Sequence, residues 1–217
     1  MKKTLTLLFS CLSVAAFSQS YDKGAKVIET RFDIGTFHTQ SHDKVNNTNS
    51  TGAAASKIIS ASFDYGVLPW LGAGIKFQYD NYFTSKDTIT HTPPQADEIV
   101  KPSVHAFDPA VFADVHFLRR DHADLLIGGT IGPSFFSYHE NDASDTRANG
   151  VGLWIDFHFT SRFYFGDHFG INLSAGYNSF NYPDMKAQSS TVPSIDSFSL
   201  KGSGGYFGLG LQYRFGD

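Results

Sequence analysis

Two Asp-x-His repeats are the first residues in this sequence whose types and spacing could do chemistry. They are Asp114-x-His116 and Asp156-x-His158. Imidazole nitrogens and carboxylate oxygens are ligands for transition metals, so two such pairs on one face could hold an ion. The alternative is a hydrogen-bonded network of carboxylates and imidazoles without an ion. Because sequence spacing fixes no ligand geometry, we expect the network, with no metal and no other cofactor.

A second candidate is the run Ser137-x-His139-Glu140. A serine nucleophile needs a base within hydrogen-bond reach and a third group that orients the base. The alternative is an ordinary polar rim where a strand meets water. No second motif supports catalysis, so we expect no enzyme and assign no catalytic residue.

The N-terminus has the pattern of a secretory signal. Lys2 and Lys3 precede an apolar run over residues 5–16, and Ala16-Phe17-Ser18 places small residues at the positions that a signal peptidase reads. We expect residues 1–18 to be removed before Gln19, which changes the formal charge from −4 to −4 − 2 = −6. The remaining chain, residues 19–217, has no cysteine, which excludes disulfides, and no basic surplus that would indicate nucleic-acid binding.

These candidate residues belong to segments in which apolar and polar residues alternate, as they do in a β-strand with one apolar face. Eight such segments are expected around residues 28–34, 59–65, 72–80, 111–117, 124–131, 151–159, 171–178 and 207–215. The composition agrees, since aromatic residues make up 15% of the chain and glycine occurs 20 times.

Alternation alone also fits a soluble sandwich or a lipocalin-like barrel. Here the apolar face is rich in aromatics, whereas the polar face mixes isolated charges with glycine and serine. A narrow lumen suits the second mixture, because small residues leave space and opposite charges can pair. We therefore expect the apolar face to point outward into lipid.

The connections alternate between short and long. Short links are expected at residues 68–70, 118–122 and 162–167, and long polar links at residues 39–56, 84–103, 140–148 and 182–198. Outer-membrane barrels have short periplasmic turns and long external loops in this order. The sequence therefore predicts an all-β fold, an eight-stranded antiparallel up-and-down transmembrane β-barrel.

The last strand and the strand-turn-strand phrase Asp64-Tyr65-Gly66-Val67-Leu68-Pro69-Trp70 resemble those of the small outer-membrane barrels of the OmpX and OmpW kind. In the last strand, Gly210, Tyr213 and Phe215 resemble the signal that the outer-membrane assembly machinery recognises. The resemblance covers essentially residues 19–217. It implies an outer-membrane location, with membrane lipid, lipopolysaccharide and the assembly machinery as partners, and leaves any external ligand unidentified.

The polar face carries the charges that we expect to line the lumen. These could form a path for ions or solutes, but an eight-stranded barrel has room for little more than its own side chains. We therefore predict a structural network of paired charges. Its members are Glu29, Arg31, Asp33, Asp64, Lys76, Asp80, Asp114, His116, Asp156, His158 and Arg214.

Three functions follow from this interpretation. The first is a non-enzymatic structural or surface-interaction role through the external loops. The second is a narrow channel for small apolar solutes, which an apolar funnel near the outer end would favour. The third, least favoured, is a lipid-modifying outer-membrane enzyme built on Ser137 and His139.

Overall fold

The computed structural model describes residues 21–83, 87–89, 98–100, 102–140, 145–189 and 196–215. The expected signal peptide, residues 1–18, and the cleavage site before Gln19 lie outside the described residues and stay predictions. Within the described part of the chain, no helix is long and apolar enough to cross a membrane.

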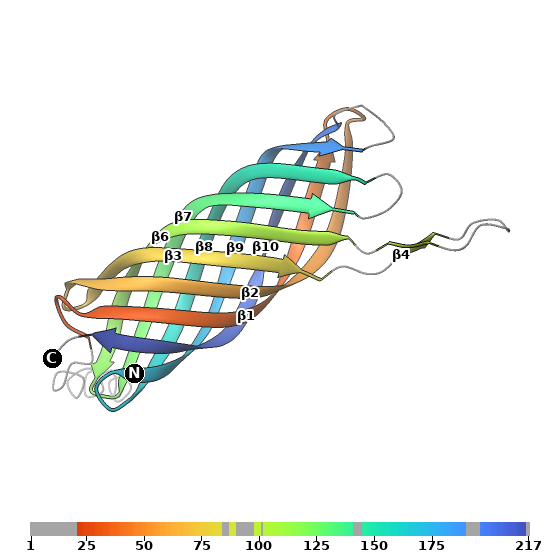
Figure 1. Ribbon diagram of the computed structural model, residues 1–217. Helices are drawn as coiled ribbons and strands as arrows, with labels where there is room; N and C mark the ends of the chain where they lie inside the picture. The colour runs from red at the N-terminus through yellow and green to blue at the C-terminus, as the bar shows by residue number, and fades with distance from the viewer. Residues whose placement is uncertain are drawn as a thin grey trace, which may run out of the picture.

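The described chain is built from strands (Figure 1). They are β1 (Lys26–Asp43), β2 (Thr48–Leu68), β3 (Leu71–Tyr82), β4 (Asp87–Ile89), β5 (Glu98–Val100), β6 (Ser103–Arg120), β7 (Ala123–His139), β8 (Arg147–Phe165), β9 (Phe169–Gln188) and β10 (Asp196–Phe215). Eight of them close an antiparallel barrel in the order β1-β10-β9-β8-β7-β6-β3-β2, and β4 and β5 form a separate two-stranded sheet. The predicted fold class is confirmed.

The two faces of each strand point as the alternation predicted. On β1, Glu29 and Asp33 are buried in the barrel, whereas Ile28 and Ile34 are 42% and 54% exposed on its outside. Large apolar side chains are exposed in the same way on all eight barrel strands. An exposed apolar belt of this kind is stable only in lipid, because in water it would be one very large apolar patch.

The strands are longer than the sequence predicted. β2 alone has 21 residues, roughly 70 Å of extended chain, although about 9–11 tilted residues cross a bilayer. Much of the expected loops 39–56 and 182–198 is therefore strand, and the β1–β2 connection is reduced to residues 44–47. The Thr-, Asn- and Ser-rich composition indicated a loop, but pairing with neighbouring strands continues through it.

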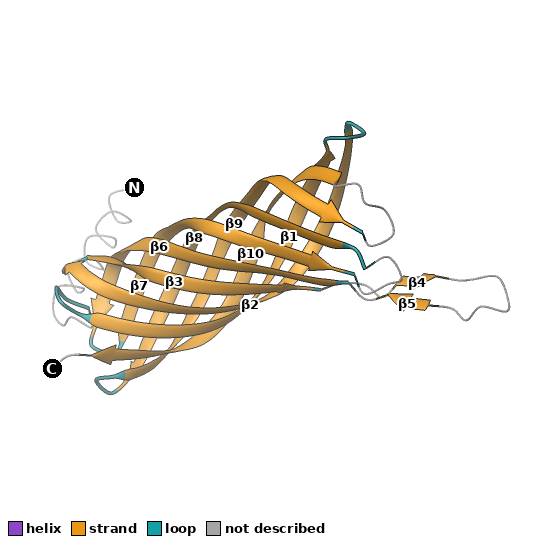
Figure 2. Ribbon diagram, turned by 45° about the horizontal axis from the view of Figure 1, so that its top comes forward, coloured by secondary structure: helices purple, strands orange, loops and turns teal. Residues whose placement is uncertain are grey.

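The short turns, at residues 69–70, 121–122 and 166–168, lie at the end of the barrel opposite to the β1–β2 connection. β1 begins and β10 ends at this same end (Figure 2). Because the short turns of outer-membrane barrels are periplasmic, the end from which the long strands protrude is the external one. The third turn starts later than expected, because β8 continues through Arg162 to Phe165. Gly166 makes that turn with a φ of 74°, a conformation that favours glycine.

Candidate functional site

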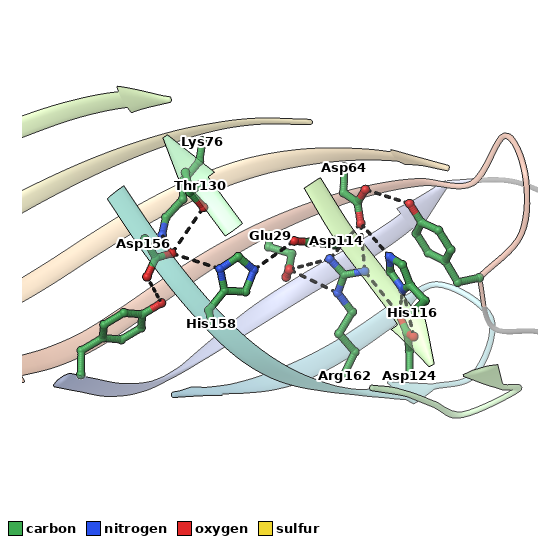
Figure 3. Close-up of polar contacts among 12 residues, drawn as sticks. Glu29, Asp64, Lys76, Asp114, His116, Asp124, Thr130, Asp156, His158 and Arg162 are labelled. Atoms are coloured by element: carbon green, nitrogen blue, oxygen red, sulfur yellow. Dashed lines mark hydrogen bonds and ion pairs between the residues drawn. The ribbon is translucent and has the colours of Figure 1, made fainter. Parts of the chain in front are cut away.

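The lumen near the short-turn end is organised around one buried cation, Arg162 on β8. Its guanidinium lies 2.9 Å from Glu29 on β1, 3.0 Å from Asp64 on β2 and 3.4 Å from Asp124 on β7 (Figure 3). The planar group presents several N–H donors in fixed directions, so one arginine can serve three carboxylates from different walls. These contacts tie together strands that are distant in the sequence.

His116 and Tyr21 complete this end of the lumen. His116 lies 2.8 Å through Nδ1 from Asp124 and 3.7 Å through Nε2 from Asp64. The ring of Tyr21 stacks on His116 with centroids 3.5 Å apart and planes 12° apart, and its hydroxyl donates to Asp64 at 2.8 Å. Tyr21 is fully buried, so the segment before β1 fills the short-turn mouth of the barrel.

A second group lies further toward the external end, around His158 and Asp156 on β8. His158 Nδ1 contacts Asp156 at 3.0 Å and Nε2 contacts Asp114 on β6 at 3.1 Å (Figure 3). Asp156 also accepts a hydrogen bond of 2.8 Å from Tyr206 and pairs with Lys76 at 3.6 Å. The four residues of the two Asp-x-His repeats therefore belong to two groups, with Asp114 facing His158 rather than His116.

The structure places ten of the eleven predicted lumen residues inside the barrel, and Arg31 and Asp33 lie 3.7 Å apart there. Arg214 is the exception. It is only partly buried and lies at the rim, where its Nε donates to the carbonyl of Asp167 at 3.0 Å and its guanidinium stacks 4.6 Å above Tyr164. Its alternation phase is that of the lumen, but it lies beside the end of β10.

The external half of the lumen is mainly apolar, with the predicted Asp80 opposite Ile58 as a buried carboxylate that accepts a hydrogen bond of 3.4 Å from Ser56. A cluster of buried side chains fills this half and comprises Phe37, Ile58, Trp154, Phe180, Tyr182, Met185 and Tyr206. Below it, Asp108 accepts a hydrogen bond from Ser134, whose hydroxyl also contacts Tyr182 at 2.6 Å. The inner end of the apolar half is thus closed by polar groups that bond to each other.

Little free space remains between the two halves. The cavity between Glu29, Arg31, Lys76 and His158 measures about 20 Å³. A single water needs about 10–15 Å³, so this space holds one or two waters and no solute. Lys76, whose Nζ lies 4.9 Å from the centre of the Trp154 ring, crosses the lumen beside it.

The candidates for catalysis and metal binding do not assemble. Among the described residues no group of three or more His, Cys, Asp or Glu side chains could hold a metal ion. His139 bonds to Asp145 at 2.8 Å, Glu140 accepts from Tyr138, and Ser137 stands opposite His105 on β6. The geometry therefore provides neither a nucleophile–base pair at Ser137 nor a metal centre in this part of the chain.

The residues of the expected assembly signal lie at the end of β10. Tyr213 packs edge-on against Phe215 with ring centroids 4.7 Å apart, and against Phe169 at 4.9 Å. Gly210 leaves no room for a larger residue, since a Cβ there would stand 2.1 Å from the carbonyl oxygen of Thr30. Their role as an assembly signal stays a prediction.

Sequence reasoning missed Arg162, Asp124 and Tyr21 as members of the lumen network. Arg162 was assigned to a turn because β8 was ended too early. Asp124 has the inward phase of its strand, which was a usable signal. Nothing in the sequence indicates that Tyr21 turns back into the barrel.

A closed antiparallel barrel of eight strands, apolar outside and charged inside, is the outer-membrane type of transmembrane β-barrel. No protein-family model and no curated protein matches the sequence. Solved structures do share the fold. OprG of Pseudomonas aeruginosa is 13% identical with a TM-score of 0.56, covering 92% of this chain and 100% of OprG.

Two further structures are similar to a comparable degree. AlkL, solved in lipid bilayers, is 15% identical with a TM-score of 0.53, covering 92% of this chain and 94% of AlkL. The Escherichia coli outer-membrane protease OmpT is 8% identical with a TM-score of 0.54, covering 88% and 97% of the two chains. These likenesses establish the fold, which is shared by proteins of different activities.

Proposed function

We propose that this chain is a non-enzymatic protein of the bacterial outer membrane that acts outside the cell through the protruding part of its barrel. The signal-like residues 1–18 and the C-terminal Tyr213 and Phe215 support export and assembly into that membrane. The observation that carries the surface role is a sheet that continues beyond the apolar belt. We call this part the protruding sheet and define it as residues 36–43, 48–55, 181–188 and 196–205.

The protruding sheet is held together at its tip. Lys44 donates a backbone hydrogen bond of 3.0 Å to the carbonyl of Ser197, and its ammonium lies 3.0 Å from Asp184. The hydroxyl of Ser197 also donates to Asp184 at 2.9 Å. The hydrogen bond from Lys44, followed by that from Ser197, holds the pKa of the Asp184 carboxyl below its ordinary value. The β1–β2 and β9–β10 hairpins are thus joined into one ordered surface.

One edge of this sheet is open. β3 stops pairing with β2 at Ser56, and the N–H of Phe83 makes a last bond to the carbonyl of Ala55 at 2.7 Å. Because every second residue of a strand directs its N–H and C=O to the same side, those of Asn49, Thr51 and Ala53 point to the open edge. No described strand pairs with them there.

The sequence of the open edge lacks two features that usually protect an edge strand. Residues 48–55 contain no charge and no proline, which are the common means of preventing strand addition. The nearest strands of the same chain, β4 and β5, pair with each other instead. Antiparallel pairing with a second copy would invert that copy in the membrane. An extended segment of another protein is therefore the ligand that this edge fits best.

Proline substitution at Thr51 and Ala53 tests this role. Each proline removes an N–H from the open side and spares the ladder with β1. We expect extended peptides selected from a 12-residue library on the purified barrel to lose binding to Thr51→Pro/Ala53→Pro and to keep binding to Thr51→Val/Ala53→Val. Equal binding to both variants would contradict the role, as would slow amide exchange at Asn49, Thr51 and Ala53 in the purified protein.

A second candidate, sideways passage of small apolar molecules, is favoured by two observations. The external half of the lumen is mainly apolar, and the β6–β7 ladder is interrupted between the pairs Phe107–Phe135 and Val111–Ile131. In the interruption Pro109 faces Pro133, and neither can donate a hydrogen bond.

Passage along the barrel axis is not part of either candidate, because Arg162 and Lys76 cross the lumen. We expect purified protein in planar bilayers to give no ion-conducting steps. Uptake of a small alkane by cells would separate the candidates, since sideways passage predicts faster uptake that Pro109→Val/Pro133→Val abolishes, whereas the surface role predicts no difference from cells without the protein.

A further inference from the structure

The outer wall contains a row of hydrogen-bond donors directly above a row of apolar side chains. Cα partners across β2, β3, β6, β7, β8 and β9 define the donor row, which consists of Lys57, Asn81, His105, Ser137, Asn149 and Lys186. One step toward the short turns, the same strands from β2 to β8 define an apolar row of Ile59, Tyr79, Phe107, Phe135 and Val151. On five neighbouring strands, the outward side chains thus change from apolar to polar between one outward residue and the next, two positions along the strand.

The donor row has a lysine at each end and no carboxylate. The acidic residues of these strands mostly face the lumen, as Asp64, Asp114 and Asp156 do. Three acids lie near the row, and each has a partner: Asp145 pairs with His139 and Arg147, Asp184 pairs with Lys44, and Glu140 accepts a hydrogen bond from Tyr138. The outer wall is therefore locally cationic although the chain as a whole is acidic.

A cavity marks the β2 end of the donor row. It has a volume of about 320 Å³ and is lined by Lys57, Asn81, Phe83 and Ser103, among others. The ammonium of Lys57 lies 4.9 Å from the centre of the Phe83 ring, which holds it at the cavity rather than free in water. Along the row, His105 contacts Ser103 through Nε2 at 2.7 Å and stacks on Tyr79 of the apolar row.

We propose that the donor row binds the phosphorylated glycolipid of the outer leaflet, one molecule at each end, with a phosphate at Lys57 in one and at Lys186 in the other, sugar hydroxyls and amides along the adjoining donors, and acyl chains on the apolar row. This ligand combines anionic groups, polar sugars and several acyl chains, which is the order of groups that the two rows present. The proposal rests on the outer-membrane location in the proposed function and adds a lipid partner on the wall, separate from the open edge of β2.

Lipid retention by the purified barrel in neutral detergent tests the proposal, measured by native mass spectrometry with bisphosphorylated lipid A as the probe. Each lysine near an anionic lipid surface contributes about a fivefold change in affinity. We therefore expect Lys57→Ala/Lys186→Ala, which removes one lysine from each end of the row, to weaken retention about fivefold. The matched control is Lys23→Ala/Lys26→Ala, which removes two lysines at the short-turn end and should leave retention unchanged.

Three comparison ligands make the test specific. Dephosphorylated lipid A should bind more weakly and be insensitive to Lys57→Ala/Lys186→Ala, and phosphatidylglycerol and inorganic phosphate should not replace lipid A. Equal retention of phosphorylated and dephosphorylated lipid A would overturn the proposal, as would an equal loss in the Lys23→Ala/Lys26→Ala control. Cell fractionation separates this failure from a failure of the outer-membrane location on which the proposal rests. If only the lipid site is wrong, the wild-type protein is still found in the outer membrane; if the location is wrong, it is missing from that membrane.

Discussion

At the scale of single residues, one buried cation of the lumen, Arg162, serves several anions. Arg162 contacts Glu29, Asp64 and Asp124, and Lys76 lies between Asp156 and the Trp154 ring. Burying an ion is costly unless it is paired and hydrogen-bonded, so such a network stabilises the fold only while it is complete. Removal of a shared cation should therefore lower the free energy of unfolding more than removal of one anion.

Replacing Arg162 with Met tests this asymmetry. The variant keeps the volume of the side chain but leaves three buried carboxylates without their cation. We expect the free energy of unfolding to fall by about 3–5 kcal/mol, measured by urea titration in lipid vesicles. Arg214→Met is the control, because Arg214 lies at the rim, and a surface contact contributes only about 0–1 kcal/mol. Similar losses in both variants would show that the Arg162 network has no special role.

The scale of strands shows what the sequence could and could not predict. Alternation identified all eight barrel strands and their outward faces, because period two is a direct consequence of strand geometry and lipid contact. It failed at strand ends. Residues 48–55 are a polar, small-residue strand with no buried side to reveal it, and Arg162 was lost with the end of β8.

Contacts inside the barrel were predictable only as a set. The inward phase of Asp114, His116 and His158 followed from alternation, but which of them meet depends on strand register and barrel closure. Asp114 contacts His158 from a strand that is not its neighbour in the sequence. Register is a property of the whole sheet, so local pattern could not assign these pairs.

The orientation of the strands gives a prediction at this scale. Ile75 points outward from β3 within the apolar belt. Arg at this position would place a charge in lipid, so we expect Ile75→Arg to lower the free energy of unfolding by about 2–4 kcal/mol, measured by chemical unfolding in vesicles. Thr51→Arg is the matched control, since it points away from the lumen beyond the belt and should change stability by less than about 1 kcal/mol. Equal effects would contradict the assigned membrane position.

The segment before β1 acts as an element in its own right. Its Gly24 N–H donates to the carbonyl of Gly66 on β2 at 2.8 Å, the Gly66 N–H donates to the carbonyl of Ala25 at 2.8 Å, and a Cβ at Gly72 would stand 2.4 Å from the Tyr21 hydroxyl. Tyr21→Ala removes a buried ring and should cost about 3–5 kcal/mol by the same unfolding assay. Tyr21→Phe removes only the bond to Asp64, which Arg162 still holds, and should cost about 1 kcal/mol. An unchanged free energy of unfolding in Tyr21→Ala would mean that the segment does not close the short-turn mouth of the barrel.

On the scale of the whole molecule, closure depends on the seam between the first and last strands. β1 pairs with β10 over its full length, from Lys26–Phe215 to Asp43–Phe198. Among the described residues this closure leaves the barrel without an exposed edge in the membrane, and the protruding part of β2 has no partner strand on one side.

A cysteine pair across the seam tests the closure and its register. Thr30 and Leu211 are Cα partners, and directly opposed residues of antiparallel strands lie within disulfide distance. We expect Thr30→Cys/Leu211→Cys to form a disulfide in the folded protein, detected by thiol titration. Thr30→Cys/Phe207→Cys, four residues out of register, should stay reduced. Bonding in the second pair only would show a different register.

The position of Tyr21 also constrains the order of events during assembly. Its ring lies on His116 of β6, and its hydroxyl bonds to Asp64 of β2. Both surfaces exist together only after β2, β3 and β6 have paired side by side. The segment that precedes every strand in the chain can therefore reach its place only when three of the strands that follow it are already in position.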